Sequence, residues 1–131
     1  GEVDPASKTF RVSNGGCPYP YHYQAASGGV SEIQIDAYPL GIRSDTQYSV
    51  AEIQLEPGDR VVLCSDGIIE AENQSGELFG FERTAETIWK GCSQDLTAPQ
   101  FLDYLINEVK TFTGETPQGD DQTVVVLAVE A

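Results

Sequence analysis

Basic side chains are scarce in this sequence of 131 residues. It has 7 Lys and Arg against 21 Asp and Glu, which leaves a formal net charge of −14. Nucleic-acid-binding faces and polybasic membrane anchors both need clustered positive charge, so we expect neither nucleic acid nor a membrane surface as a partner. The acid excess instead favours binding of cations, including metal ions.

Long apolar runs and methionine are also missing. No run approaches the roughly 18–20 residues of a membrane span, and we expect no signal peptide. Hydrophobic residues still make up 40% of the chain, enough for the core of one domain. Because the chain starts at Gly1 and has no Met, we expect it to have been trimmed, tagged or cut from a longer protein.

Cysteine and histidine are too few for the usual sites built from them. Cys17, Cys64 and Cys92 are widely spaced and form no CxxC pair, which argues against a zinc knuckle and a disulfide framework. We therefore predict a reduced, cytoplasmic compartment. The single histidine, His22, lies between two tyrosines in a predicted strand and is expected to be structural. No GxSxG motif accompanies it, so a Ser-His-Asp device is not supported.

The first half of the chain is typical of β-structure. Turn residues at 13–18 separate the first two predicted strands and favour a hairpin with a long loop. The next two strands alternate apolar and polar residues, whereas the fifth is apolar without alternation, as in a central strand covered on both faces. The five predicted strands are Lys8–Val12, Tyr19–Gln24, Val30–Ile35, Tyr48–Leu55 and Arg60–Ser65.

Helices and one more strand follow. Phe81–Lys90 has helical spacing, with Trp89 expected in the core and Gly91 as the cap. Thr97–Gln100 has the form of a capping box, and an apolar stripe runs from Phe101 to Phe112 before Gly114 stops the helix. Thr123–Val129 closes the chain as a second central strand. This order predicts an α+β fold with mostly antiparallel pairing and helices laid on a sheet.

Two of the apolar strands meet aspartates. Asp66 directly follows Arg60–Ser65, and Asp120 and Asp121 directly precede Thr123–Val129. If these strands are antiparallel neighbours, Asp66 and Asp120 converge at one edge of the sheet. Converging carboxylates repel unless a cation or proton separates them, and oxygen ligands with water suit Mg²⁺ or Mn²⁺. The alternative is that these are solvated turn residues, since Asp-Gly is a common turn pair.

An ordered set of segments then resembles landmarks of the PPM-type (protein phosphatase 2C-like) serine/threonine phosphatases, closest to their SpoIIE/RsbU branch. The central one is Ser65-Asp66-Gly67 with Glu70-Ala71, which is similar to the branch's "TDG-(I/V)-E-A" segment. The others, in chain order, are Pro39–Ile42 ("PLG"), Leu55–Asp59 ("L-x-x-GD"), Gly76–Gly80 ("G-E-x-F-G") and Gly119–Thr123 ("DDxT").

The resemblance implies a fold and an activity. The fold is an antiparallel β-sandwich of two sheets flanked by helices in αββα layers. The activity is hydrolysis of phosphoserine or phosphothreonine by a metal-bound water at a dinuclear Mn²⁺ or Mg²⁺ centre, within a larger bacterial signalling protein. Asp66 and Asp120 match metal ligands and catalytic residues, with Gly67 and Asp121 in supporting roles. The implied substrate is a regulatory phosphoprotein such as an anti-sigma-factor antagonist.

The sequence departs from the branch in two places. Cys17 stands where the branch's "N-A-G-H-x-P" segment has histidine, and nothing matches the upstream "GD-(V/M)-SGHG" motif with its bridging aspartate. We therefore expect residues 1–131 to be the C-terminal part of the phosphatase domain, inactive alone, and to self-associate or pair with the N-terminal part. The alternative is a non-catalytic half-domain or pseudophosphatase that acts as a protein-interaction module.

Overall fold

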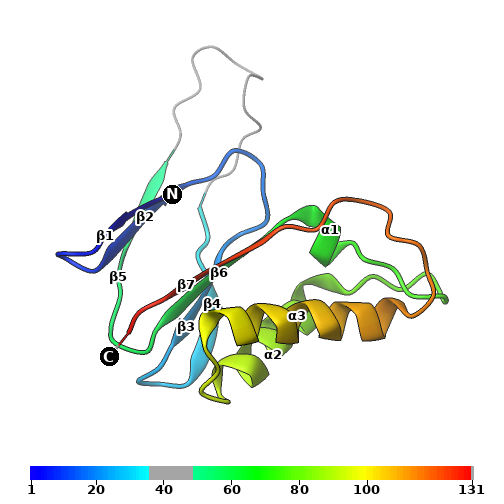
Figure 1. Cartoon of the computed structure of the whole chain (residues 1–131). Helices are drawn as coiled ribbons and strands as arrows, with labels where there is room; N and C mark the ends of the chain where they lie inside the picture. Colours follow the sequence, from blue (N-terminus) through cyan, green and yellow to red (C-terminus); the bar gives the residue numbers. More distant parts are fainter. Residues whose placement is uncertain (36–48, 131) are drawn as a thin grey trace, which may run out of the picture.

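The computed structural model describes residues 1–35 and 49–130, which form three layers (Figure 1). A three-stranded sheet has the order β1-β2-β5, and a four-stranded sheet has the order β4-β3-β6-β7, with all pairing antiparallel. Helices α2 and α3 cover the four-stranded sheet. The elements are β1 (Glu2–Asp4), β2 (Thr9–Ser13), β3 (Tyr21–Gln24), β4 (Gly29–Glu32), β5 (Val50–Gln54), β6 (Arg60–Cys64), α1 (Asp66–Ile69), α2 (Gly80–Cys92), α3 (Ala98–Thr113) and β7 (Val124–Ala128).

Two apolar clusters hold these layers together. One lies between the two sheets and is built from Phe10, Val12, Ile33, Ile35, Leu55 and Val61. The other lies between the four-stranded sheet and the helices and includes Tyr21, Val62, Cys64, Ile68, Ile88, Phe101, Leu105 and Val109. The predicted α+β class and antiparallel sandwich are therefore confirmed. On the outer face of the three-stranded sheet, the Arg11 and Glu52 side chains are 51% and 62% exposed.

Strand β6 is the covered central strand that its apolar run predicted. Val61 packs into the cluster between the sheets, and Val62 packs into the cluster under the helices. Both are fully buried. Each such side chain contributes roughly 1.5–3 kcal/mol relative to its exposed state, so β6 anchors both halves of the core.

Strand β7 was predicted to be central as well, and for the described residues this is wrong. It is the last strand in the sheet order, paired with β6 on one side. Val124 and Val126 pack toward the helices, but Val125 is 48% exposed. An apolar run indicates that both faces of a strand can be buried, but it does not indicate whether the strand pairs with one or two other strands.

The predicted hairpin between the first two strands is also wrong. β2 pairs with β1 and β5, whereas β3 pairs with β4 and β6, so the segment between them crosses from one sheet to the other. Asn14 holds this crossing: its Oδ1 accepts hydrogen bonds from the Gly16 and Cys17 amides at 3.0 and 2.8 Å. Strand β1 was not predicted, because its three residues precede a proline turn.

Helix α2 begins and ends near its predicted bounds but presents a different face. Thr84, Thr87 and Ile88 are buried, whereas Phe81 and Trp89 are 52% and 48% exposed. The two threonines tolerate burial because their hydroxyls donate to the Gly80 and Arg83 carbonyls, both at 2.7 Å. The prediction that Trp89 packs in the core is therefore wrong.

Gly91 serves packing rather than capping. It lies inside α2, and a Cβ atom there would come within 2.8 Å of the Phe101 ring. Helix α3, by contrast, matches its prediction. Thr97 and Gln100 form the capping box, and Gly114 ends the helix with φ of 58°. Among the described residues, no helix combines the length and apolarity that crossing a bilayer requires.

Candidate functional site

The end of β6 lies beside the start of β7. Cys64 is opposite Val124 in the antiparallel register, and the Ser65 amide continues the ladder by donating to the Thr123 carbonyl at 2.9 Å. The condition set in the sequence analysis, that these two strands are antiparallel neighbours, is therefore met. It brings the segment that carries Asp66 alongside the segment that carries Asp120 and Asp121.

Asp66 opens the short helix α1, which the sequence did not predict. The helix is anchored by Ile68 and Ile69, which are buried, while Asp66 itself is exposed. The Asp66 carbonyl accepts a hydrogen bond from the Glu70 amide at 2.8 Å. The backbone of Asp66 is thus held by the core, and its carboxylate faces solvent.

Gly67 packs directly against the other segment. A Cβ atom at this position would overlap the Asp121 carbonyl oxygen and lie 2.8 Å from the carbonyl carbon. Such separations are not available to a side chain, so the two backbones approach this closely only with glycine here. Gly119 has no comparable contact, since nothing lies within 4 Å of its would-be Cβ.

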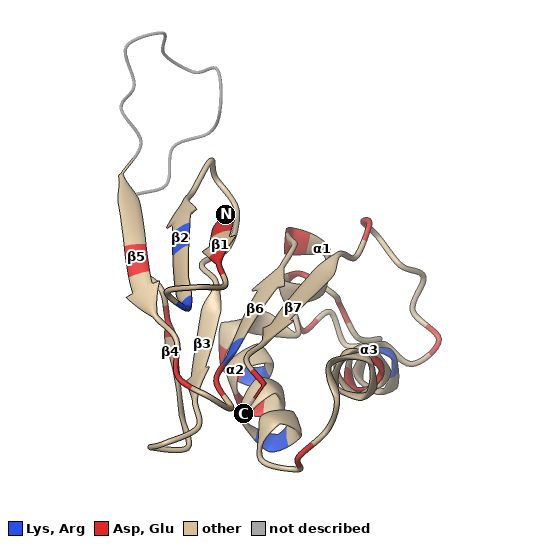
Figure 2. Cartoon of the chain, turned by 60° about the vertical axis from the view of Figure 1, so that its left-hand side comes forward, with Lys and Arg blue, Asp and Glu red and all other residues tan. Residues whose placement is uncertain are grey.

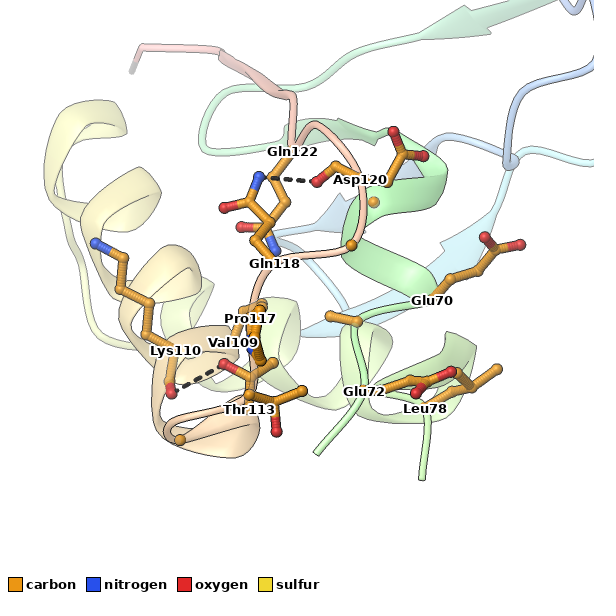
Figure 3. A pocket seen from close by; sticks show the side chains of 15 residues that line it. Glu70, Glu72, Leu78, Val109, Lys110, Thr113, Pro117, Gln118, Asp120 and Gln122 are labelled. Atoms are coloured by element: carbon orange, nitrogen blue, oxygen red, sulfur yellow. Dashed lines mark hydrogen bonds between the residues drawn. The ribbon is translucent and has the colours of Figure 1, made fainter. Parts of the chain in front are cut away.

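Asp120 is held by its neighbours in the sequence. Its Oδ1 accepts the Asp121 amide at 2.7 Å, and its carbonyl accepts the Gln118 side-chain amide at 2.8 Å (Figure 3). The Asp120 and Asp121 side chains are both exposed. Figure 2 shows acidic residues at the start of α1 and along the segment that leads from α3 to β7.

A cavity of about 630 Å³ opens next to Asp120 (Figure 3). Its walls come from the loop after α1, the end of α3 and the segment before β7. Three carboxylates line it, those of Glu70, Glu72 and Asp120, against the single ammonium group of Lys110. This cavity could not be predicted from the sequence, because its walls come from segments far apart in the chain. Asp66 does not line it.

Comparison with known proteins identifies the family. A family model described as Stage II sporulation protein E (SpoIIE) matches residues 1–130. The chain belongs to the SpoIIE family. Among curated proteins, this SpoIIE-family chain is 21% identical over 122 residues to Protein IcfG of Synechocystis sp., a match that covers 88% of the chain and 19% of that protein.

Solved structures agree on the fold. The SpoIIE-family chain is similar to the SiaA-PP2C domain of Pseudomonas aeruginosa, with a TM-score of 0.77, 23% identity, and coverage of 98% of the chain and 49% of that domain. It is also similar to the PP2C phosphatase domain of SpoIIE from Bacillus subtilis, with a TM-score of 0.76, 23% identity, and coverage of 98% and 36%. The chain therefore adopts part of the PP2C fold and spans about half the length, or less, of these matches.

The aspartates at this edge of the SpoIIE-family chain are of the type that binds a divalent metal ion, but there are too few of them to complete its coordination. Asp66 and Asp120 offer exposed carboxylates, which are the hard oxygen donors that Mg²⁺ and Mn²⁺ prefer. Within residues 1–35 and 49–130, however, no group of three or more His, Cys, Asp or Glu side chains is placed to hold a metal ion. A complete coordination shell would need further ligands.

His22 lies away from this edge and has a structural partner. Its Nε2 is 2.9 Å from Oδ2 of Asp59, and both side chains are buried. Asp59 also accepts the Ala25 amide at 2.9 Å. Because Asp59 precedes β6 and Asp66 follows it, the pair sits at the opposite end of the strand. His22 was predicted to be structural, whereas its partner Asp59 was not predicted.

The three cysteines differ in environment. Burial raises the pKa of the Cys64 thiol to about 12 and that of Cys92 to about 11. Both thiols are therefore neutral near pH 7 and unsuited to nucleophilic catalysis. Cys17, at the position where the branch has histidine, is exposed. The Pro39–Ile42 landmark lies outside the described residues.

Proposed function

We propose that this chain is the C-terminal part of a PP2C-type phosphatase domain that removes phosphate from phosphoserine or phosphothreonine on a regulatory protein. Membership of the SpoIIE family and the shared PP2C fold support the reaction class. Coverage of 49% of the SiaA-PP2C domain supports the reading as part of a domain. The natural setting is a larger bacterial signalling protein in the cytoplasm.

The observation that carries the proposal is the pairing of β6 with β7. The Cys64–Val124 register and the bond from the Ser65 amide to the Thr123 carbonyl put two aspartate-bearing segments side by side. If the aspartates were only solvated turn residues, the two segments would not have to lie next to each other. A cation between the carboxylates relieves their repulsion, which is the chemistry expected of a metal site.

In this reading Asp66 and Asp120 hold Mn²⁺ or Mg²⁺, in a dinuclear centre once the domain is complete. A bound divalent cation supplies Lewis acidity and charge neutralisation toward a phosphate ester. Asp120 is oriented by the Asp121 amide on its Oδ1, which leaves the second oxygen available. Gly67 and Asp121 support the site through their close backbone contact.

The substrate reaches the site from solvent. Asp66, Asp120 and Asp121 are all exposed, so a phosphorylated side chain on another protein has access to them. The family resemblance favours anti-sigma-factor antagonists as substrates.

The chain by itself is expected to have little or no activity. Two carboxylates without further ligands hold Mg²⁺ or Mn²⁺ weakly, because Mg²⁺ gives up water reluctantly and favours a nearly complete octahedron. Self-association, or pairing with the N-terminal part of the domain, would cover the strand edges left open in the isolated chain. The activity therefore belongs to the complete domain.

The test is phosphate release by the full-length parent protein with Mn²⁺, on phosphoserine peptides and p-nitrophenyl phosphate. Asp66→Asn and Asp120→Asn are expected to lower kcat by at least 100-fold, since each removes a charged ligand. Asp103→Asn is the matched control, because Asp103 is an exposed aspartate on α3, away from this edge. No phosphate release by the wild-type parent on any of these substrates would end the enzymatic reading.

A non-catalytic interaction module is the second candidate. It is favoured by the lack of any three-membered ligand group among the described residues. The two candidates differ in Mn²⁺ binding by the parent protein. A pseudophosphatase would bind no Mn²⁺ at Asp66 and Asp120, whereas the phosphatase would lose its Mn²⁺ binding in the Asp66→Asn variant.

A further inference from the structure

We infer that Ser65 is a positioning residue of the proposed metal site. Its hydroxyl joins the segment that carries Asp66 to the segment that carries Asp120 and Asp121. The inference rests on the proposed function, because that function makes this edge a metal site. The hydrogen bonds of Ser65 are observed in the structure whatever the function is. This role requires no contact between Ser65 and the substrate. It acts on the carboxylates through the backbone between them.

The Ser65 side chain is free for this role because it does not cap α1. Ser65 occupies the N-cap position with extended backbone angles, φ of −80° and ψ of 168°. A serine there ordinarily accepts a hydrogen bond from an amide in the first turn of its helix. No such bond is present in α1.

The hydroxyl reaches across to the β7 side instead. Its Oγ accepts the Thr123 amide at 2.9 Å and donates to the Asp121 carbonyl at 3.3 Å. With the Ser65 amide bonded to the Thr123 carbonyl at 2.9 Å, one residue makes three bonds to the segment before β7. The side chain thus extends the strand ladder beyond Cys64 and Val124, the last pair in the register.

These bonds continue to the Asp120 carboxylate. The peptide group between Asp120 and Asp121 donates its N–H to Asp120 Oδ1 at 2.7 Å. The next carbonyl along, that of Asp121, accepts from Ser65. Asp121 is therefore held at both ends of its backbone. The Ser65 hydroxyl and the Asp120 carboxylate are linked through this one residue.

Gly67 complements the hydroxyl. It lets the Asp121 carbonyl approach α1 closely, and the Ser65 hydroxyl donates to that same oxygen. A glycine permits the approach without specifying it, whereas a hydrogen bond specifies it. Removing the hydroxyl is therefore expected to loosen the spacing between the two carboxylate-bearing segments while leaving the strand pairing in place.

The test uses an isosteric pair, Ser65→Thr and Ser65→Val, in the 131-residue chain. Threonine keeps the hydroxyl and valine replaces it with a methyl group of similar shape. In the metal-free chain, we expect the Thr123 amide to exchange hydrogen at the wild-type rate in Ser65→Thr and about 10-fold or more faster in Ser65→Val. Valine removes the Oγ acceptor of this amide, so the amide is no longer protected by that hydrogen bond. Ser65→Ala repeats the measurement with a smaller side chain.

A second measurement follows Mn²⁺ through paramagnetic broadening of the amide signals around Asp120. Partners that orient a ligand typically affect metal affinity by 10–100-fold, so Ser65→Val should weaken binding by roughly 10-fold and Ser65→Thr should restore it. Equal Thr123 exchange in the two variants overturns the inference. Absence of Mn²⁺ broadening in the wild-type chain and the parent protein counts against the proposed function alone, because the exchange measurement contains no metal.

Discussion

Gly67 and Asp121 touch through their backbones at a distance that only glycine allows. A Cβ atom on Gly67 would overlap the Asp121 carbonyl oxygen. We expect Gly67→Ala to lower the free energy of unfolding by about 1–3 kcal/mol, because one of the two segments must shift to relieve the overlap. Urea denaturation of the chain measures this change.

Gly119→Ala is the control for this prediction. Nothing lies within 4 Å of a Cβ atom at Gly119, so the same substitution two residues away from Asp121 meets open space. Its free energy of unfolding should stay within about 0.5 kcal/mol of wild type. Equal losses in the two variants would show that backbone flexibility, not the contact with Asp121, sets the cost.

The buried pair of His22 and Asp59 is expected to dominate the stability of the turn before β6. Asp59→Ala removes the partner of His22 and the acceptor of the Ala25 and Glu56 amides. Leaving a buried hydrogen-bonding group without its partner costs about 1–3 kcal/mol. Chemical denaturation should show a loss of this size.

The exposed pair of Arg11 and Glu52 provides the comparison. Its atoms are 3.4 Å apart, and both side chains are more than half exposed. Glu52→Ala should therefore cost no more than about 1 kcal/mol. If Asp59→Ala cost as little as Glu52→Ala, the His22–Asp59 contact would not be a stabilising interaction.

Stability should fall at alkaline pH. Burial raises the pKa of Cys64 from 9.0 to about 12 and that of Cys92 from 9.0 to about 11, and it raises the pKa of Tyr21 as well. These groups therefore lose protons more readily in the unfolded chain than in the folded one. Their contribution is fully present below pH 9 and is lost as pH rises through 11 to 12.

Urea midpoints measured between pH 8 and pH 11 check this sign. We expect a steady decrease above pH 9 in wild type. The Cys17→Ser variant should show the same decrease, because Cys17 is exposed. A midpoint that rises over this range would contradict the assignment of buried, protonated thiols.

Only one thiol should react rapidly with a water-soluble disulfide reagent at pH 8. Cys17 is exposed, whereas Cys64 and Cys92 are buried with raised pKa values. Since the thiolate is the reactive form, the folded chain should release one equivalent quickly and all three after denaturation. The fast equivalent should vanish in Cys17→Ser. Its persistence there would mean that a buried cysteine is accessible.

The sequence by itself determined what depends on neighbouring residues. The apolar run of β6, the capping box of Thr97 and Gln100, and the stop at Gly114 follow from periodicity and local backbone chemistry. The ordered motifs likewise pointed to the family that residues 1–130 match. The sequence placed an aspartate at the end of one apolar strand and at the start of another, but it offered the antiparallel pairing of β6 and β7 only as a condition, which the structure meets.

Only the tertiary structure decided which surfaces meet. The turn residues after β2 suit a hairpin and a crossing between sheets equally well, so the choice depended on partners far along the chain. Helix α2 has apolar residues on two faces, and the cluster beneath it selected Ile88 over Phe81 and Trp89. The roles of Ser65 and Gly67 also rest on the Asp121 carbonyl, which lies more than fifty positions away in the chain. Local patterns report what a segment can form, whereas hydrogen bonds and packing between distant segments decide what it contacts.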